Sequence, residues 1–368
     1  MNWQLIDNDA ELAQVLAELE PAAEVAVDTE FMRRNTYYPQ VALLQLCAGE
    51  RAWLVDPLAI EDLDGLRQLM SDASTLKILH SCSEDLEVFR HWLGVLPTPL
   101  VDTQRAAALV GEPFGLGYRA LVERLCGVEL DKGETRSDWL RRPLSEAQCH
   151  YAALDVTELL PAWRQLRERA EARGRMDWVL EEGAAVALAM AERERELHRR
   201  VKGSGRLNAR QLEVLRRLCE WREDRARETD KPRGWIVDDK LCLAIARAMP
   251  QRREDLQALE LPPAVLRRQG DQLLSLVEEA RAVPAHELPA PASAPLAAED
   301  RDRLKQLRDA AKQISEAQGI APEAGLASAD LELLVREARG EAIDPPSRWD
   351  GWRRDVLLRP LRAELQRC

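Results

Sequence analysis

Short apolar runs alternate with helix-like patterns in the first half of the chain. Five runs are bounded by turn residues and are typical of strands: they cover residues 24–31, 41–48, 51–57, 76–81 and 100–103. Between and after them, apolar residues recur at helical spacing in residues 60–71, 83–94, 117–127 and 145–173. This alternation predicts an α/β domain in which helices pack on a mixed five-stranded sheet.

The sheet is predicted to be mixed because one of its connections is very short. Only Gly49 and Glu50 separate the second and third runs, which suits an antiparallel hairpin and is too short for a crossover between parallel strands. Further along, Ser145 and Gln148 have the spacing of a capping box, so we expect a helix to begin there.

Strand patterns nearly vanish beyond about residue 175. The remaining chain is rich in Arg, Glu, Leu and Ala at helical spacing, and a Pro- and Ala-rich stretch at 282–300 is typical of a linker. We therefore predict three domains, an α/β domain at 1–175 and two all-α domains at 205–283 and 300–368.

The charge pattern bears on possible partners. With 46% hydrophobic and 32% charged residues the chain is typical of a globular protein, and its net charge of −12 argues against a passive nucleic-acid coat. An enzyme whose acidic site is neutralised by a divalent metal remains compatible with that charge. Residues 197–217 nevertheless carry seven Lys or Arg against one acid, Glu213, so this stretch is either a solvated helix face or a contact for phosphates.

Other features of the sequence predict a cytoplasmic protein. Its seven cysteines are scattered without a CxxC pair, which indicates reduced thiols and neither disulfides nor a zinc site. No apolar run is long enough to cross a bilayer, and the first residues lack a signal-peptide pattern. The phosphate-binding pattern GxxxxGK[ST] is missing, so we expect no use of ATP.

Four carboxylates are candidates for chemistry. Asp28 and Glu30 end the first predicted strand, and residues two apart on a strand point to the same side. Asp85 lies in the first turn of the helix after the fourth strand, where it could equally serve the helix N-terminus. Tyr151 and Asp155 are four apart, so they share one face of a predicted helix, where Tyr151 could equally be a core aromatic.

These groups are expected to meet at one edge of the sheet. Ligands of α/β sheets gather outside the carboxyl ends of the strands, where the first three acids lie, and the final helix can bring Asp155 to the same edge. Converging carboxylates repel one another unless cations lie between them. Ligands that are all oxygen favour Mg²⁺ or Mn²⁺ over zinc.

Three sequence blocks, in this order and spacing, resemble the motifs of a known nuclease superfamily. They are "DTEF" with "RRNTYYPQ", "HSCSEDLEVF" and "HYAALDV". They are similar to the three exonuclease motifs of the DEDD superfamily, in the subgroup with Tyr in its third motif. The resemblance extends downstream, where "LCEWREDRARETDKPRGWIVDDKLCLAIAR" is similar to an HRDC domain and a second, HRDC-like module follows. The whole arrangement resembles the bacterial ribonuclease D family.

This resemblance implies a ribonuclease H-like fold, two HRDC-type domains and a 3′→5′ exoribonuclease that releases 5′-mononucleotides. It implies that Asp28, Glu30 and Asp155 hold one of two divalent ions, Mg²⁺ or Mn²⁺, and that Asp28 bridges to the second ion with Asp85. Tyr151 would then orient the attacking water. The implied partner is RNA, in particular tRNA precursors with a free 3′ end, and a monomer is favoured.

Residues near the motifs are candidates for binding the substrate. We expect stacking or phosphate contacts from residues beside the first motif and from the loop before the third: Phe31, Met32, Tyr38, Lys132, Arg136 and Trp139. Surface charge and one packed Trp explain the loop residues equally well. Two other functions stay open, a DEDD-type DNA exonuclease with the same five active-site residues and an inactive RNA-binding scaffold.

Overall fold

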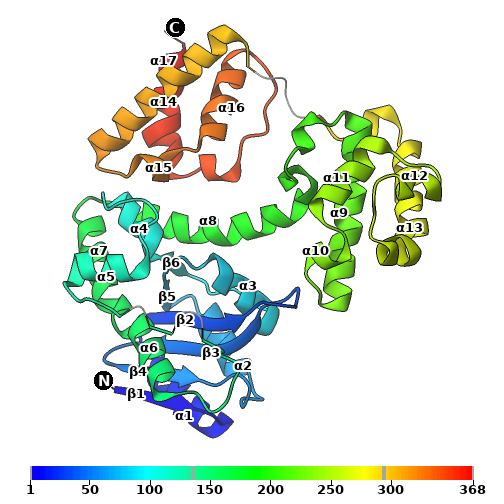
Figure 1. The fold of residues 1–368 in the computed structure, drawn as a ribbon. Coiled ribbons are helices and arrows are strands. Elements are labelled where there is room, and N and C mark those ends of the chain that lie inside the picture. Colours follow the sequence, from blue (N-terminus) through cyan, green and yellow to red (C-terminus); the bar gives the residue numbers. More distant parts are fainter. Residues whose placement is uncertain (1, 132, 135–136, 292–295, 367–368) are drawn as a thin grey trace. The chain divides into compact units, whose positions relative to one another are not determined.

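The computed structural model describes residues 2–131, 133–134, 137–291 and 296–366 (Figure 1). Over these ranges, no helix is both long enough and apolar enough to span a membrane. The chain divides into two compact units. The first contains Met1–Met32, Gln40–Leu188 and Leu296–Cys368, and the second contains Arg33–Pro39 and Ala189–Pro295.

The first unit is built on a mixed sheet, as predicted. Among the described residues its strands are β1 (Asn2–Ile6), β2 (Glu24–Met32), β3 (Gln40–Cys47), β4 (Arg51–Val55), β5 (Leu76–Leu79) and β6 (Leu100–Asp102), in the order β1-β4-β3-β2-β5-β6. The central pairs β2–β3 and β3–β4 are antiparallel, which confirms the predicted hairpin. The pairs β1–β4, β2–β5 and β5–β6 are parallel.

The predicted number of five strands is wrong, because the sheet has six within the described part of the chain. The missed strand is β1, which lies at the edge of the sheet and pairs with β4 over five residues. Its residues are mostly exposed or half-exposed, so they show no continuous apolar run. Pairing with a strand about fifty residues away creates this element, and local sequence does not signal it.

Helices cover both faces of the sheet. The helices of the α/β part are α1 (Asp9–Leu19), α2 (Asp64–Ser71), α3 (Ser83–Trp92), α4 (Thr103–Leu109), α5 (Tyr118–Cys126), α6 (Glu146–Thr157) and α7 (Leu159–Glu171). Helix α6 contacts β1 to β4, while α3 contacts β2 and β3. The predicted capping box is confirmed, since the Ser145 and Gln148 side chains each bond the other residue's backbone at the start of α6.

The last helices pack in the same unit as the sheet. They are α8 (Met176–Arg195), which belongs to this unit up to Leu188, then α14 (Ala298–Gln318), α15 (Pro322–Gly325), α16 (Ser328–Ala338), a 3-10 turn (Ser347–Trp349), a π-helical turn (Arg354–Leu358) and α17 (Arg359–Leu365). Leu307 and Leu334 belong to the same buried cluster as Ala26 on β2. The Trp352 ring stacks on the Trp178 ring with centroids 5.0 Å apart, which adds an aromatic contact to this packing.

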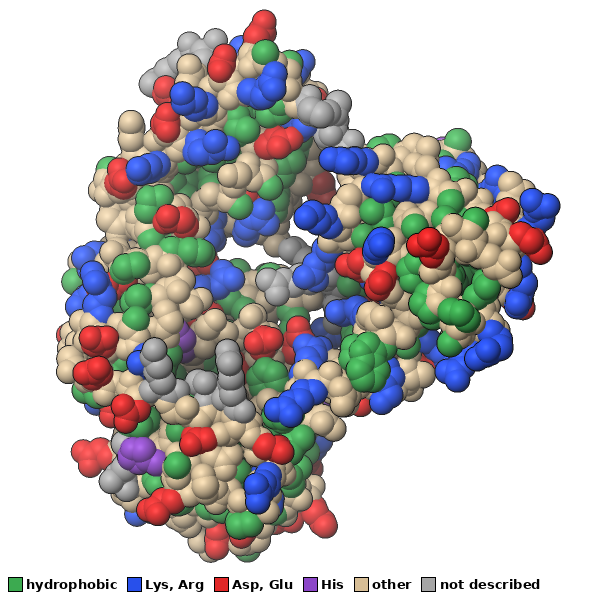
Figure 2. Space-filling view, in the orientation of Figure 1, with side chains coloured by type: hydrophobic (Ala, Val, Ile, Leu, Met, Phe, Trp, Pro, Cys, Tyr) green, Lys and Arg blue, Asp and Glu red, His purple; other side chains and the backbone are tan. Residues whose placement is uncertain are grey.

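The second unit is helical apart from residues 33–39. Its helices are α9 (Ala209–Thr229), α10 (Arg233–Ile236), α11 (Asp239–Ala248), α12 (Arg253–Gln257) and α13 (Pro263–Ala282), with 3-10 turns at Leu197–Arg200, Ser204–Arg206 and Ala285–Glu287. Leu215, Leu218, Ile245 and Leu273 are fully buried in its core. Lys and Arg side chains are spread over the surface of this unit among acidic ones (Figure 2).

Candidate active site

Three of the predicted carboxylates meet on one face of the sheet. Asp28 and Glu30 lie near the end of β2, and their spacing of two residues directs both toward the face that α6 covers. Asp155 comes from α6. One oxygen atom from each of these three carboxylates lies within 4.8 Å of the other two, which is close enough for all three to bind one cation.

The fourth carboxylate reaches the site from the other side of the sheet. Asp85 lies in the first turn of α3, and its side chain is only 8% exposed. Thr29 stands between Asp28 and Glu30 and therefore faces away from them, and its hydroxyl donates a hydrogen bond of 2.5 Å to Asp85. Strand β2 thus carries Asp28 and Glu30 on one face, and on its opposite face Thr29 binds the side chain of Asp85.

Burial and mutual repulsion raise the pKa values of these carboxylates. Burial, followed by repulsion from Asp155 and Asp85, raises the pKa of Glu30 to about 9. Burial also raises the pKa of Asp155 to about 7 and that of Asp85 to about 6. The pKa of Asp28 is raised well above its ordinary range by burial and by its three acidic neighbours. A divalent cation would remove this repulsion, so an all-oxygen donor set with excess negative charge fits Mg²⁺ or Mn²⁺.

Tyr151 lies one helical turn from Asp155 on α6, as predicted. Its side chain is half-buried, and its ring lies 6.1 Å from the ring of Trp139. Burial, and then the negative charge of Asp155, raises the pKa of the Tyr151 phenol. The hydroxyl therefore keeps its proton at neutral pH and remains a hydrogen-bond donor beside the carboxylates.

A pocket of about 500 Å³ opens beside these groups. Its lining consists of Asp28, Glu30, His80, Gly117, Tyr118, Arg119, Ala120, Tyr151, Asp155 and Leu159. Three of these lining residues, His80, Tyr118 and Arg119, were not predicted from the sequence, although His80 begins the second motif block. Tyr118 donates a hydrogen bond of 2.7 Å to the carbonyl oxygen of Leu154, which ties α5 to the helix that carries Asp155.

The predicted substrate-binding residues are less closely grouped than the carboxylates. Phe31 and Met32 are half-buried at the end of β2. Trp139 is 2% exposed and belongs to the hydrophobic core, where it contacts the ring of Tyr151. Lys132 and Arg136 lie outside the described residues.

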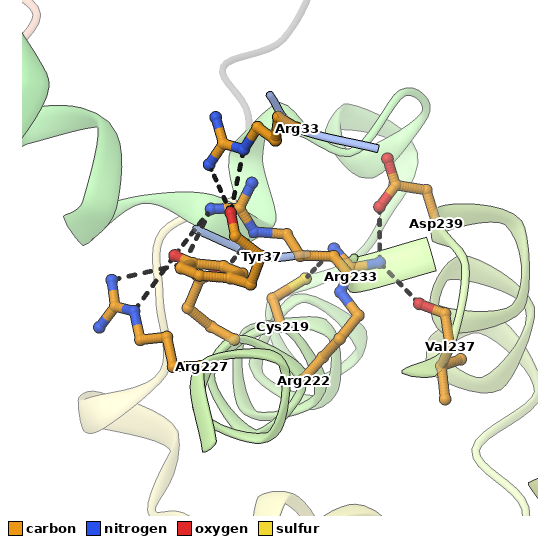
Figure 3. Close-up of polar contacts among 9 residues, drawn as sticks. Arg33, Tyr37, Cys219, Arg222, Arg227, Arg233, Val237 and Asp239 are labelled. Carbon is orange, nitrogen blue, oxygen red and sulfur yellow. Dashed lines mark hydrogen bonds and ion pairs between the residues drawn. The ribbon is translucent and has the colours of Figure 1, made fainter. Parts of the chain in front are cut away.

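Tyr38 lies in residues 33–39, which belong to the helical unit although they directly follow β2. The backbone N–H groups of Tyr37 and Tyr38 donate hydrogen bonds of 2.9 and 3.0 Å to Asp230 at the end of α9. The Tyr37 ring lies between the guanidinium groups of Arg227 and Arg233, whose carbon atoms are 5.8 and 5.1 Å from its centroid (Figure 3). The helical unit therefore anchors the segment that leaves the strand bearing Asp28.

Comparison with known proteins identifies the family. A family model described as a 3′-5′ exonuclease matches residues 3–171, and an HRDC-domain model matches residues 211–277. Ribonuclease D of Pseudomonas paraeruginosa is 41% identical over 367 residues, covering 99% of this chain and 97% of its own. The chain belongs to the ribonuclease D family.

A solved structure and a second relative agree with this membership in the ribonuclease D family. The crystal structure of Escherichia coli RNase D, described as an exoribonuclease involved in structured RNA processing, matches with a TM-score of 0.89 and 36% identity over 100% of this chain and 99% of that one. Ribonuclease D of Serratia proteamaculans is 37% identical over the full length of both chains. The resemblance inferred from the three motifs is therefore confirmed, and a DNA-directed exonuclease is not favoured.

Proposed function

We propose that this protein is a metal-dependent 3′→5′ exoribonuclease that releases 5′-mononucleotides from RNA one at a time. The observation that carries the proposal is the convergence of Asp28, Glu30 and Asp155 within 4.8 Å, beside the phenol of Tyr151 and an open pocket. Membership in the ribonuclease D family supports the same reaction.

Two divalent ions, Mg²⁺ or Mn²⁺, would occupy the carboxylate cluster. Asp28, Glu30 and Asp155 would hold the first, and Asp28 would be shared with the second, which Asp85 holds directly or through water. When bound, the pair of ions activates the attacking water and stabilises the departing 3′ oxygen. The four carboxylates would hold the ions in place, and the ions would neutralise the repulsion among the carboxylates and between them and the scissile phosphate.

Tyr151 contributes a positioned hydrogen bond. The phenol stays protonated because its pKa is raised, so it can accept from or donate to the attacking water and fix the angle of attack. Asp155 lies one turn away, so one helix supplies both an ion ligand and the group that orients the nucleophile.

The substrate in this proposal is RNA with a free 3′ end, such as a tRNA precursor. Phe31, Met32 and Tyr38 would contact the terminal nucleotides, and Lys132 and Arg136 would contact phosphates. Trp139 would act by packing against Tyr151, since its side chain is 2% exposed. We further propose a cytoplasmic monomer that needs no ATP, with an exonuclease domain at 1–175, an HRDC domain at 205–283 and an HRDC-like domain at 300–368.

The proposal is tested with a single-stranded RNA, the same RNA in circular form and a DNA of the same sequence. With Mg²⁺ or Mn²⁺ the linear RNA should shorten from its 3′ end, and mass spectrometry should find 5′-mononucleotides. The circular RNA should persist, the DNA should be cut far more slowly, and EDTA should stop the reaction. Internal cleavage of the circle, or equal rates on RNA and DNA, would contradict the proposal. RNA binding without any cleavage would support the inactive scaffold.

A further inference from the structure

Gln45 is a polar residue in the middle of β3, and the side chain is completely buried. Among the described residues, neither its amide nitrogen nor its amide oxygen has a hydrogen-bond partner. Buried polar side chains in proteins are nearly always paired, because an unpaired amide loses its bonds to water without replacement. The buried, unpaired amide of Gln45 therefore indicates a role other than packing.

The register of the sheet shows what surrounds this amide. Gln45 is paired with Asp28 of β2 on one side and with Leu54 of β4 on the other. Paired residues of antiparallel strands point to the same face. Leu43 and Cys47, two residues before and after Gln45, are buried in the core on that face. Asp28 is thus the polar neighbour of Gln45 across the strands.

The side-chain amide of Gln45 is chemically suited to a position beside Asp28. A carboxylate that must bind cations needs its lone pairs held in a fixed direction, and a hydrogen-bond donor at its side does this. Lys or Arg in that place would neutralise the carboxylate and compete with a cation, and Glu would add repulsion to the cluster. The neutral NH₂ group of Gln orients the carboxylate without either effect.

We propose that Gln45 is a positioning residue for Asp28. This structure contains no such bond among the residues that it describes. When ions occupy the cluster, the Gln45 amide would donate a hydrogen bond to the Asp28 carboxylate, directly or through one water, and so hold that carboxylate in the direction that binds the ions. The inference deepens the proposed function and rests on the metal site described there. It predicts that Gln45 affects ion binding through Asp28 without touching RNA.

The main test is Gln45→Met, which keeps the length of the side chain and removes the amide. The matched control is Leu54→Met, because Leu54 is also buried and flanks Gln45 on the side away from Asp28. Three quantities are measured for each full-length variant: the melting temperature without metal, the Kd for Mn²⁺ by electron paramagnetic resonance of free Mn²⁺, and the steady-state kinetics on RNA.

Without metal, we expect Gln45→Met to melt at the same or a higher temperature than the wild type, because the buried amide that it removes has no hydrogen-bond partner among the described residues in the absence of ions. Its Kd for Mn²⁺ should rise about 10- to 100-fold and kcat should fall, with KM for RNA unchanged. The control should match the wild type in Mn²⁺ affinity and kcat. Wild-type Mn²⁺ affinity and kcat in Gln45→Met would overturn the inference, whatever its melting temperature.

A second measurement does not require replacing Gln45. With ¹⁵N in the Gln side-chain amides, adding Mg²⁺ should shift the Gln45 NH₂ signals in the wild type, and Asp28→Asn should abolish that shift. An Mg²⁺-dependent shift that survives in Asp28→Asn, or no shift in the wild type, would overturn the inference. If the wild type fails to cleave RNA while Gln45→Met still weakens Mn²⁺ binding, the proposed activity is wrong and the positioning role stands.

Discussion

The hydroxyl of Thr29 donates a 2.5 Å hydrogen bond to Asp85 and joins β2 to the first turn of α3. This bond stabilises the charged form of Asp85 and opposes the effect of burial, so the pKa of that carboxyl rises only to about 6. Thr29 thereby controls the ionisation of an acid that lies far from it in the sequence.

Replacing Thr29 by Val tests this control, since Val keeps the branched shape and lacks the donor. The pKa of Asp85 should rise, so a larger fraction of molecules should carry a protonated Asp85 near pH 7. We expect kcat at pH 7 to fall about tenfold and to recover as the pH increases, whereas Thr29→Ser should behave like the wild type. A pH–rate profile measures this. Superimposable profiles for Val and wild type would show that the bond has no role in catalysis.

Removing a ligand charge should abolish turnover and preserve the fold. Asp28→Asn and Asp155→Asn each delete one carboxylate from a cluster whose members repel one another, so melting without metal should occur at the same or a higher temperature. Turnover should fall by several orders of magnitude, and RNA should still bind. Glu61→Gln, an exposed position, is the control. Near-normal cleavage by either Asn variant would rule out the metal-site assignment.

Tyr151→Phe deletes one hydroxyl and preserves the ring that packs against Trp139. If the phenol orients the attacking water, kcat should drop by about 10²–10³, with little change in RNA affinity or melting temperature. Rapid-quench kinetics and thermal unfolding measure the two quantities separately. A variant that loses stability and keeps its rate would instead identify Tyr151 as a core aromatic.

The stability of the metal-free protein should decrease as the pH rises. Glu30, Asp155 and Asp85 have folded-state pKa values of about 9, 7 and 6, all above the ordinary values of 4.5 for Glu and 3.8 for Asp. Between the unfolded and folded pKa values the native state binds more protons, so stability falls with increasing pH from about 4 to 9.

Divalent cations should reverse this trend, because they bind the deprotonated carboxylates. Thermal unfolding between pH 5 and 9, with EDTA or with Mn²⁺, measures both effects. We expect the increase in melting temperature caused by Mn²⁺ to grow with pH and to disappear in Asp155→Asn. A metal-free protein that is more stable at pH 8.5 than at pH 5.5 would contradict the carboxylate pKa shifts.

The basic stretch at 197–217 is only partly available to RNA. Glu213 pairs with two of its arginines, whereas Arg200 and Arg206 are exposed and make no ion pair among the described residues. The double variant Arg200→Ala/Arg206→Ala should weaken RNA binding. The slope of log K against log salt concentration should also become less steep, by about 0.7–0.9 for each lost phosphate contact. Arg267→Ala/Arg268→Ala, which changes exposed charges on α13, is the matched control. Equal slopes for the two double variants would show that Arg200 and Arg206 make no phosphate contact that the exposed arginines of α13 do not also make.

Local sequence determined those features of this protein whose cause lies within a few residues. The spacing of Asp28 and Glu30 places both on one face of a strand, and that of Tyr151 and Asp155 places both on one face of a helix. The hairpin at Gly49 follows from a two-residue connection. Such patterns depend on backbone periodicity alone, so they were predicted without knowledge of the fold.

Tertiary structure alone decided which distant surfaces meet. Strand β1 exists because its edge pairs with β4, Thr29 reaches Asp85 because α3 packs on the opposite face, and Gln45 lies beside Asp28 because of the β2–β3 register. The burial of Tyr37 against Glu223, 186 residues away, has the same origin. Each of these contacts joins segments whose own patterns fit several partners, and only the packing of the complete chain selects one of them.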